Sequence, residues 1–213
     1  MGAPILALAL LTSCVSRTPD RVTALPDQAT EPTQETRQCL ARLVGAGAAF
    51  SPLPDRDYGT GCAIRGAVSI AGLRGDDRQF MLTNLGPVTC PTAEKLAGWV
   101  QFGVDRAARQ ILGSPLAQIE TMGSYACRNV AGTPRLSAHS RAQAIDIAAF
   151  ILADGRRVSM LEDWNGGTQP EQDFLRIVHQ SACRRFATVL GPEYNAAHRD
   201  HLHVEIGEGS YCR

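Results

Sequence analysis

The sequence predicts a single α+β domain in which helices flank a small, mostly antiparallel sheet. The chain of 213 residues has room for one domain of ordinary size and little more. Two helical patterns stand beside a group of short strand signals, a combination typical of the α+β class. A hydrophobic content of 44% can fill a core, whereas 20 Gly and 12 Pro argue against a long helical bundle or a coiled coil.

Two segments carry helical patterns. The first helix is expected from Pro91 to Leu112, with Thr92 as its cap and Gly113 as its stop. The second is expected from Pro170 to Leu190, where Gly191-Pro192 ends it. Its apolar stripe consists of Phe174, Ile177, Val178, Cys183, Phe186 and Leu190.

Short strand signals lie between and after the helices. The strongest covers Gln143 to Leu152 and is followed by a turn at residues 153–156 and a return strand near Arg157 to Met160. A shorter strand is expected from Ala117 to Met122, and the last strand from His201 to Ile206. Together these strands predict the antiparallel sheet.

The alternation of side chains within two of these strands points to a polar site. Asp146 shares one face of its strand with small alanines, whereas isoleucines occupy the other face. In the last strand, His201, His203 and Glu205 share one face, opposite Leu202, Val204 and Ile206. Paired in one sheet, the two strands would bring a carboxylate and imidazoles together over a cavity, which is the arrangement of a metal site.

The net charge excludes some classes of partner. The chain carries 21 Lys and Arg against 21 Asp and Glu, so a general affinity for nucleic acid or anionic lipid is not expected. No apolar run, such as Ile5 to Leu11, exceeds seven residues, and a helix needs about 20 to span a bilayer. No transmembrane helix is therefore predicted.

The N-terminal segment predicts export and tethering. Residues 1–13 are apolar, end in small polar residues and read as a secretory signal. Residues 11–14, Leu-Thr-Ser-Cys, resemble the bacterial lipobox, in which Cys14 becomes the lipidated first residue of a lipoprotein. Residues 14–37 read as a disordered tether, and residues 38–213 as the folded domain. Because Ser16 stands where an inner-membrane retention signal has Asp, we expect a lipid anchor at the outer membrane, on the periplasmic side of a Gram-negative envelope.

The remaining cysteines support the same compartment. An even number of widely spaced cysteines without a CxxC pair is typical of three disulfides formed under oxidising conditions. We expect Cys39 to pair with Cys62, because that bond closes a short loop, and the other pairings stay open. The six residues are Cys39, Cys62, Cys90, Cys127, Cys183 and Cys212.

A third ligand completes the candidate metal site. His139 stands seven residues before Asp146. Together with His203 these residues offer two imidazoles and a carboxylate, a ligand set of catalytic zinc that leaves a fourth position for water. One Zn²⁺ ion is therefore the expected cofactor.

The motifs around these residues resemble a known superfamily. The segment from Ser137 to Asp146 resembles the SxHxxGxAxD motif of the M15-type D-Ala-D-Ala peptidases and their LAS relatives, and residues 200–203 resemble their closing HxH motif. The motif glycine is Ala142 here, which requires a compatible backbone angle. Residues 123–128, the Leu-Ala-Asp-Gly turn and the final Asp-His-Leu-His more closely resemble the extensin-like C-terminal domain, over roughly residues 38–213.

The resemblance implies a fold and roles for individual residues. The fold would be that of the LAS and M15 peptidases, stapled here by disulfides, with zinc held by His139, Asp146 and His203. The general base would be His201 or Asp200, with His198 as a further candidate, and strand geometry favours His201 because it projects from the same face as His203. The residues around the ligands would be Arg128, which orients substrate, and Ser137 and His198, which shape and support the site.

These features predict a zinc-dependent peptidase that cleaves peptidoglycan stem peptides by attack of a metal-activated water on an amide. Two alternatives stay open. The domain could keep the metal without catalysis and serve as a cell-wall binding or scaffold lipoprotein, or it could be a structural envelope lipoprotein without a metal.

Overall fold

The computed structural model describes residues 1–2 and 31–213. The predictions for the signal segment, Cys14 and Ser16 lie outside the described residues. Helix α1 (Gln34–Gly45) begins within the last residues of the expected tether, and the Oγ1 atom of Thr33 caps it by accepting a hydrogen bond from the Thr36 amide at 3.1 Å. In the described part of the chain, no helix is long and apolar enough to cross a membrane.

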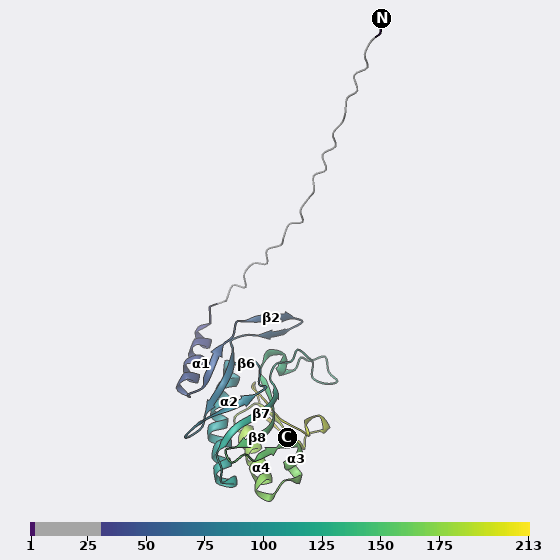
Figure 1. Ribbon diagram of the computed structural model, residues 1–213. Coiled ribbons are helices and arrows are strands. Elements are labelled where there is room, and N and C mark those ends of the chain that lie inside the picture. The colour runs from purple at the N-terminus through teal and green to yellow at the C-terminus, as the bar shows by residue number, and fades with distance from the viewer. Residues whose placement is uncertain (3–30) are drawn as a thin grey trace.

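The domain is α+β, as predicted, but its sheet is larger than expected. Strands before residue 90, which carried no strand prediction, extend it to ten strands (Figure 1). The order along the main path is β1-β4-β5-β7-β8-β11-β10-β12, with β6 beside β4 and β9 beside β8. The pairs β5–β7 and β10–β12 are parallel and the other pairs antiparallel, so the sheet is mixed. A separate hairpin pairs β2 with β3.

The strands have the following bounds: β1 Ala49–Pro52, β2 Arg56–Gly59, β3 Cys62–Ile64, β4 Ala67–Arg74, β5 Gln79–Thr83, β6 Val88–Thr89, β7 Leu116–Gly123, β8 Ala144–Leu152, β9 Arg157–Ser159, β10 Thr188–Leu190, β11 Leu202–Glu205 and β12 Tyr211–Cys212. The helices after α1 are α2 Cys90–Trp99, the π-helical segments η1 Val100–Asp105 and η2 Ala108–Leu112, the 3₁₀ turns η3 Ala138–Arg141 and η4 Ala196–His198, and α3 Met160–Gly166 and α4 Gln169–Cys183.

The first predicted helix is present, but only its first part is α-helical. It begins one residue early, at Cys90, so Thr89 and not Thr92 occupies the capping position. From Val100 onward it is largely π-helical, and it ends where predicted, at Gly113 with φ 70°. Gly103 lets α4 approach this helix, because a Cβ there would lie 2.7 Å from the Oγ atom of Ser181.

The second predicted helix ends earlier than expected. Helix α4 stops at Cys183, and residues 188–190 form strand β10 beside β11. The β-branched Thr188 and Val189 suit a strand, and pairing there satisfies backbone groups of β11 that a continued helix would leave open. Ile177, expected on the apolar stripe, is 42% exposed.

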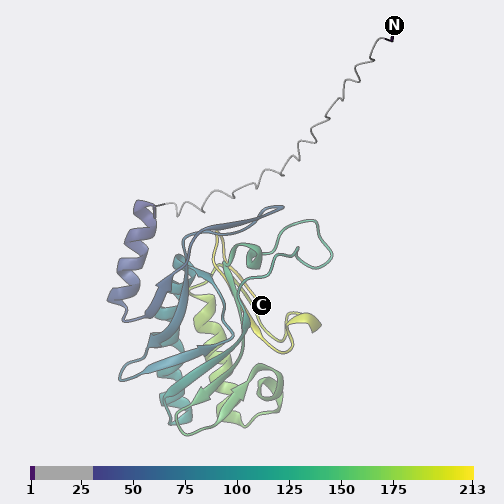
Figure 2. The same cartoon turned by 45° about the horizontal axis from the view of Figure 1, so that its top comes forward.

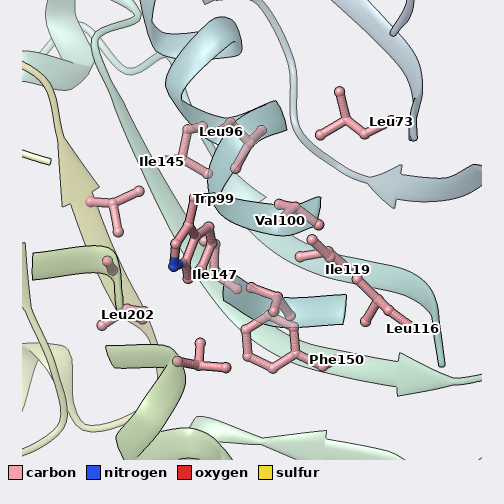
Figure 3. Packing of buried hydrophobic residues seen from close by; sticks show 14 of the residues in the cluster. Leu73, Leu96, Trp99, Val100, Leu116, Ile119, Ile145, Ile147, Phe150 and Leu202 are labelled. Carbon is pink, nitrogen blue, oxygen red and sulfur yellow. The ribbon is translucent and has the colours of Figure 1, made fainter. Parts of the chain in front are cut away.

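The core lies between the sheet and the layer formed by α2, its π-helical continuation and α4, which run side by side (Figure 2). Trp99 packs edge-on against Phe150 (Figure 3) and against Phe186. Its Nε1 atom donates a hydrogen bond to the Oγ atom of Ser181 in α4. Ile145 and Ile147, on the apolar face predicted for their strand, are fully buried against this layer.

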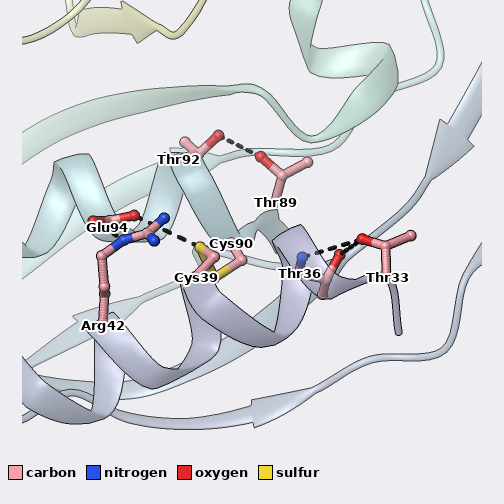
Figure 4. The surroundings of a disulfide bond; sticks show 8 residues. All are labelled: Thr33, Thr36, Cys39, Arg42, Thr89, Cys90, Thr92 and Glu94. Atoms are coloured by element: carbon pink, nitrogen blue, oxygen red, sulfur yellow. Dashed lines mark hydrogen bonds and ion pairs between the residues drawn. A yellow bond between two sulfur atoms is a disulfide. The ribbon is translucent and has the colours of Figure 1, made fainter. Parts of the chain in front are cut away.

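The three disulfides are present, but the expected pairing of Cys39 with Cys62 is wrong. Helix α1 packs on α2, so Cys39 bonds Cys90, and Arg42 pairs with Glu94 at 2.7 Å beside that bond (Figure 4). Short separation in sequence did not decide the pairing, because folding brings other cysteines within reach. The two further bonds join Cys62 to Cys127 and Cys183 to Cys212.

Removal of the Cys62–Cys127 bond is expected to lower the free energy of unfolding. The bond closes a separation of 65 residues, for which loop-closure entropy corresponds to about 4 kcal/mol. We expect the Cys62→Ala, Cys127→Ala double variant to lose about 2–4 kcal/mol, measured by urea unfolding of the oxidised proteins. A loss below about 1 kcal/mol would contradict this account.

Candidate metal centre

Two of the three predicted ligands face each other across neighbouring strands. In the antiparallel pair β8–β11, Asp146 lies directly opposite His203. The Oδ1 atom of Asp146 is 2.9 Å from the Nδ1 atom of His203. The predicted alternation is therefore present, with Leu202 and Val204 buried on the opposite face of β11.

The third ligand comes from a short turn beside the sheet. His139 lies in η3, where the Oγ atom of Ser137 faces the His139 amide at 3.4 Å. The turn ends at Ala142, whose φ of 55° and ψ of 33° put it in the left-handed region. Ala142 thus has the backbone conformation that the motif glycine would require, and the chain continues from it into β8.

The three donor atoms converge. The Nε2 atom of His139 lies 3.2 Å from the Nδ1 atom of His203 and 3.3 Å from the Oδ2 atom of Asp146. Donor atoms bound tetrahedrally at about 2.0–2.1 Å from zinc would stand about 3.3 Å apart. The separations of 3.2 Å between the two imidazole nitrogens and 3.3 Å between His139 and the Oδ2 atom of Asp146 match this value, and His203 lies 2.9 Å from the other carboxylate oxygen, Oδ1.

Hydrogen bonds to the outer ring nitrogens orient both imidazoles. The Nδ1 atom of His139 donates to the backbone oxygen of Ser124 at 2.8 Å, and the Nε2 atom of His203 donates to Glu205 at 3.3 Å. Carbonyl and carboxylate partners of this kind direct the opposite nitrogen toward a metal. Both inner nitrogens point at Asp146, so the arrangement is a possible metal-binding group.

The ionisation of this group in the metal-free protein follows from its contacts. Burial raises the pKa of the Asp146 carboxyl, but hydrogen bonds and charges from His139 and His203 outweigh it and hold that pKa well below its usual range. Burial lowers the pKa of His203, but hydrogen bonds to Asp146 and Glu205 outweigh it and raise that pKa to about 9. Without a metal, His203 is therefore protonated at neutral pH.

The two candidate bases, His201 and Asp200, are hydrogen-bonded to each other beside the ligands. The Nδ1 atom of His201 donates to the Oδ1 atom of Asp200 at 2.8 Å, and its Nε2 atom lies 3.6 Å from the Oδ1 atom of Asp146. The hydrogen bond to His201 lowers the pKa of Asp200 and keeps this carboxyl ionised. Asp200 thus orients His201, and the free ring nitrogen of His201 faces the ligands.

His198 lies beside this pair, with its ring tilted by 44° to that of His201. Its ring centroid is 5.0 Å from that of His201, and its Nδ1 atom donates to the Oδ1 atom of Asn195 at 2.8 Å. Burial and the nearby charges of His201 and His203 lower its pKa to about 4. His198 is therefore neutral at pH 7.

The ligands form the floor of an open cleft of about 490 Å³. Two loops border it: the segment between β7 and η3, and the segment around η4, which project from the same side of the domain (Figure 2). Arg128 lines the first wall, and Tyr194 and Tyr211 line the second. The donor atoms are thus buried on the sheet side and open to a ligand on the other.

Some residues of the site had no predicted role. Glu205 accepts a hydrogen bond from His203. The side-chain alternation, which puts Glu205 on the same face as His203, could have indicated this contact. The carbonyl of Ser124 has no such signal, because the backbone oxygen of any residue can accept a hydrogen bond. Arg135, Tyr194 and Tyr211 line the cleft through loop and terminal segments without a periodic pattern.

Comparison with known protein families matches residues 37–213 to the family described as the extensin-like protein C-terminus. No curated protein and no solved structure matches the chain.

The raised pKa of His203 predicts that a metal ion must displace a proton. We expect the apparent affinity for Zn²⁺ to rise about tenfold per pH unit from pH 7 to about 9 and to level off above that pH, because one proton leaves the Nδ1 atom on binding. Competition with a coloured chelator across this range measures the slope. A pH-independent affinity between pH 7 and 9 would show that His203 carries no proton to displace.

The left-handed backbone at Ala142 predicts a specific sensitivity to substitution. Ala142→Val should lower the free energy of unfolding by about 1–3 kcal/mol through overpacking, and by a further amount because a β-branched side chain is a genuine outlier in the left-handed region. Ala144→Val is the matched control, because Ala144 is equally buried but lies in regular strand β8. Equal losses in urea unfolding would mean that the backbone conformation contributes nothing.

Proposed function

Because the chain belongs to the family with an extensin-like C-terminus, and because its histidines and Asp146 converge under an open cleft, we propose that it is a zinc-dependent peptidase acting on peptidoglycan stem peptides. The observation that carries the proposal is the convergence of two imidazole nitrogens and one carboxylate on the floor of the cleft. The nitrogens of His139 and His203 lie 3.2 Å apart, and each is 2.9–3.3 Å from an oxygen of Asp146. The choice of zinc and of a peptide substrate rests on the resemblance of the two motifs to those of the M15-type peptidases.

His139, Asp146 and His203 would hold the ion, with an overall charge near +1 for neutral imidazoles and one carboxylate. Zinc supplies Lewis acidity, which polarises an amide carbonyl and lowers the pKa of water to about 7. The ligands leave the cleft side open, so a substrate amide can reach the centre from the solvent.

His201 is the general base of the proposal. Its Nε2 atom would accept a proton from the attacking water and return a proton to the departing amine nitrogen. Asp200 holds the other ring nitrogen at 2.8 Å, which keeps the Nε2 lone pair directed at the ligands and stabilises the imidazolium. The bond to be broken is the amide C–N bond, and the products are a carboxylic acid and an amine.

Arg128 and His198 complete the reacting region. The guanidinium of Arg128 can bind a substrate carboxylate or stabilise negative charge developing on the amide oxygen. His198, neutral at pH 7 and with its ring proton donated to Asn195, can accept one hydrogen bond at its Nε2 atom beside His201. These roles follow the family resemblance at the same positions.

The expected location belongs to the same proposal. Three disulfides suit an oxidising compartment such as the periplasm. A lipid anchor at Cys14 would bring the domain to the inner side of the outer membrane, within reach of peptidoglycan.

Substitutions can separate metal binding from proton transfer. We expect His203→Ala to lose both bound zinc and hydrolysis, because a ligand is missing. His201→Gln should keep zinc but lose about 10²–10⁴-fold in kcat, because no general base remains. Elemental analysis and cleavage of muropeptides, followed by chromatography, measure the two effects.

His179→Gln is the control, because His179 lies on α4 and its Nε2 atom contacts the backbone oxygen of Arg213 outside the cleft. This variant should match the wild type in both assays. Undiminished hydrolysis by His203→Ala would reject the mechanism. Bound zinc without hydrolysis of any stem peptide would favour a metal-stabilised binding module instead.

A further inference from the structure

The loop that carries Arg128 is a short two-stranded ribbon. The backbone amide of Ser137 donates to the oxygen of Arg128 at 3.0 Å, and the amide of Val130 donates to the oxygen of Arg135 at 2.8 Å. Asn129 and Leu136 form the antiparallel bridge between these bonds. Arg128 therefore lies opposite Ser137, and Val130 opposite Arg135.

This register puts both arginines on the same face of the ribbon. Side chains alternate along each strand, and residues directly opposite share a face. Arg128, Val130, Arg135 and Ser137 consequently project to one side, and these same four residues line the cleft. Asn129 and Leu136 project to the other side and do not line it. The ribbon thus presents two guanidinium groups to the cleft.

The two arginines differ in their distance from the candidate ligands. Arg128 is level with Ser137, two residues before His139, whereas Arg135 lies two residues farther toward the tip of the ribbon. At about 3.3 Å per residue, the two positions are about 7 Å apart along the ribbon. Arg128 therefore faces the inner part of the cleft and Arg135 the outer part.

Neither charge is neutralised within the described residues. Across residues 31–213, no carboxylate forms an ion pair with Arg128 or Arg135. The acidic residues that line the cleft are Asp146 and Glu205, and both are engaged by His203. The opposite wall offers the uncharged Tyr194 and Tyr211, which are 40% and 47% exposed.

We propose that Arg135 is a second carboxylate-binding residue, and that the substrate is a peptide with two carboxylates about 7 Å apart, the spacing of alternate residues in an extended chain. This inference rests on the proposed peptidase function and names its substrate class more closely. Arg128 binds the carboxylate nearer to the scissile amide and Arg135 the farther one. The planar fork of donors on arginine suits a carboxylate, which it can bind through two parallel hydrogen bonds.

The test uses zinc-loaded protein and three versions of one synthetic stem-type peptide. In the first both carboxyls are free, in the second the farther carboxyl is amidated, and in the third both are amidated. For the wild type, amidation of the farther carboxyl should raise KM about fivefold to tenfold and leave kcat within about twofold, because an exposed charge-assisted contact is lost away from the reacting atoms.

Arg135→Gln should show the same rise in KM with the free peptide and should no longer distinguish the first peptide from the second. Arg141→Gln is the matched control, because it removes the same charge from another exposed arginine. Arg141 lines a separate hollow with Thr89 and Gln143. An Arg135→Gln protein that still discriminates between the two peptides, or that behaves like Arg141→Gln, overturns the inference.

Equilibrium binding of the same peptides, labelled with a fluorophore, distinguishes failure of the peptidase proposal from failure of the carboxylate site at Arg135. If no peptide is hydrolysed but the dicarboxylate peptide binds, and binds about fivefold to tenfold more weakly to Arg135→Gln, the peptidase proposal fails and the carboxylate site stands. If hydrolysis occurs and neither KM nor binding depends on Arg135, the carboxylate site fails and the peptidase proposal stands. Weaker binding at high ionic strength is expected in the first case, because salt screens exposed charges.

Discussion

The register between β8 and β11 is the constraint on which the site depends. Asp146 stands opposite His203 because the isoleucines of β8 and the Leu202 and Val204 side chains of β11 are buried on the other face. A slip of one residue would turn all of these side chains around, exposing the apolar set and burying the polar one. Hydrophobic burial thus holds the carboxylate and one imidazole together, although neither contributes to the core.

The third donor is held by different means. His139 lies on a 3₁₀ turn, whose exit requires a left-handed Ala142, and its ring is fixed by the carbonyl of Ser124 at the end of β7. The disulfide between Cys62 and Cys127 anchors the segment that leads from β7 toward this turn. Rigid strands therefore supply two ligands, and a turn constrained by backbone contacts supplies the third, which leaves little freedom for the donor atoms to separate.

Segments with a strong periodic pattern could be predicted from the sequence. Segments whose secondary structure is set by pairing with other parts of the fold could not. The strand over residues 144–152 and the helix ending before Gly113 have clear patterns and stop signals, so they were found nearly to the residue. Residues 188–190 continue the helical pattern of α4, yet they pair with β11, because an open strand edge in the fold outweighs local propensity. The strands before residue 90 carried no prediction for a different reason. Except for β4 they have only two to five residues, too few to show a clear alternation, although β2 pairs with β3 and β4 with β5 in local hairpins.

The amino-acid sequence by itself determined the residue types of the candidate site and the faces on which they stand. The alternation in two strands and the residues around His139 were sufficient to select His139, Asp146, His201 and His203. The tertiary structure decided which cysteines bond, where α4 ends, that Asp200 orients His201, and that Arg128 and Arg135 share one wall of the cleft. Side-chain alternation is a local property of a strand and can therefore be recognised in the sequence. Pairing between distant segments depends on the packing of the whole domain.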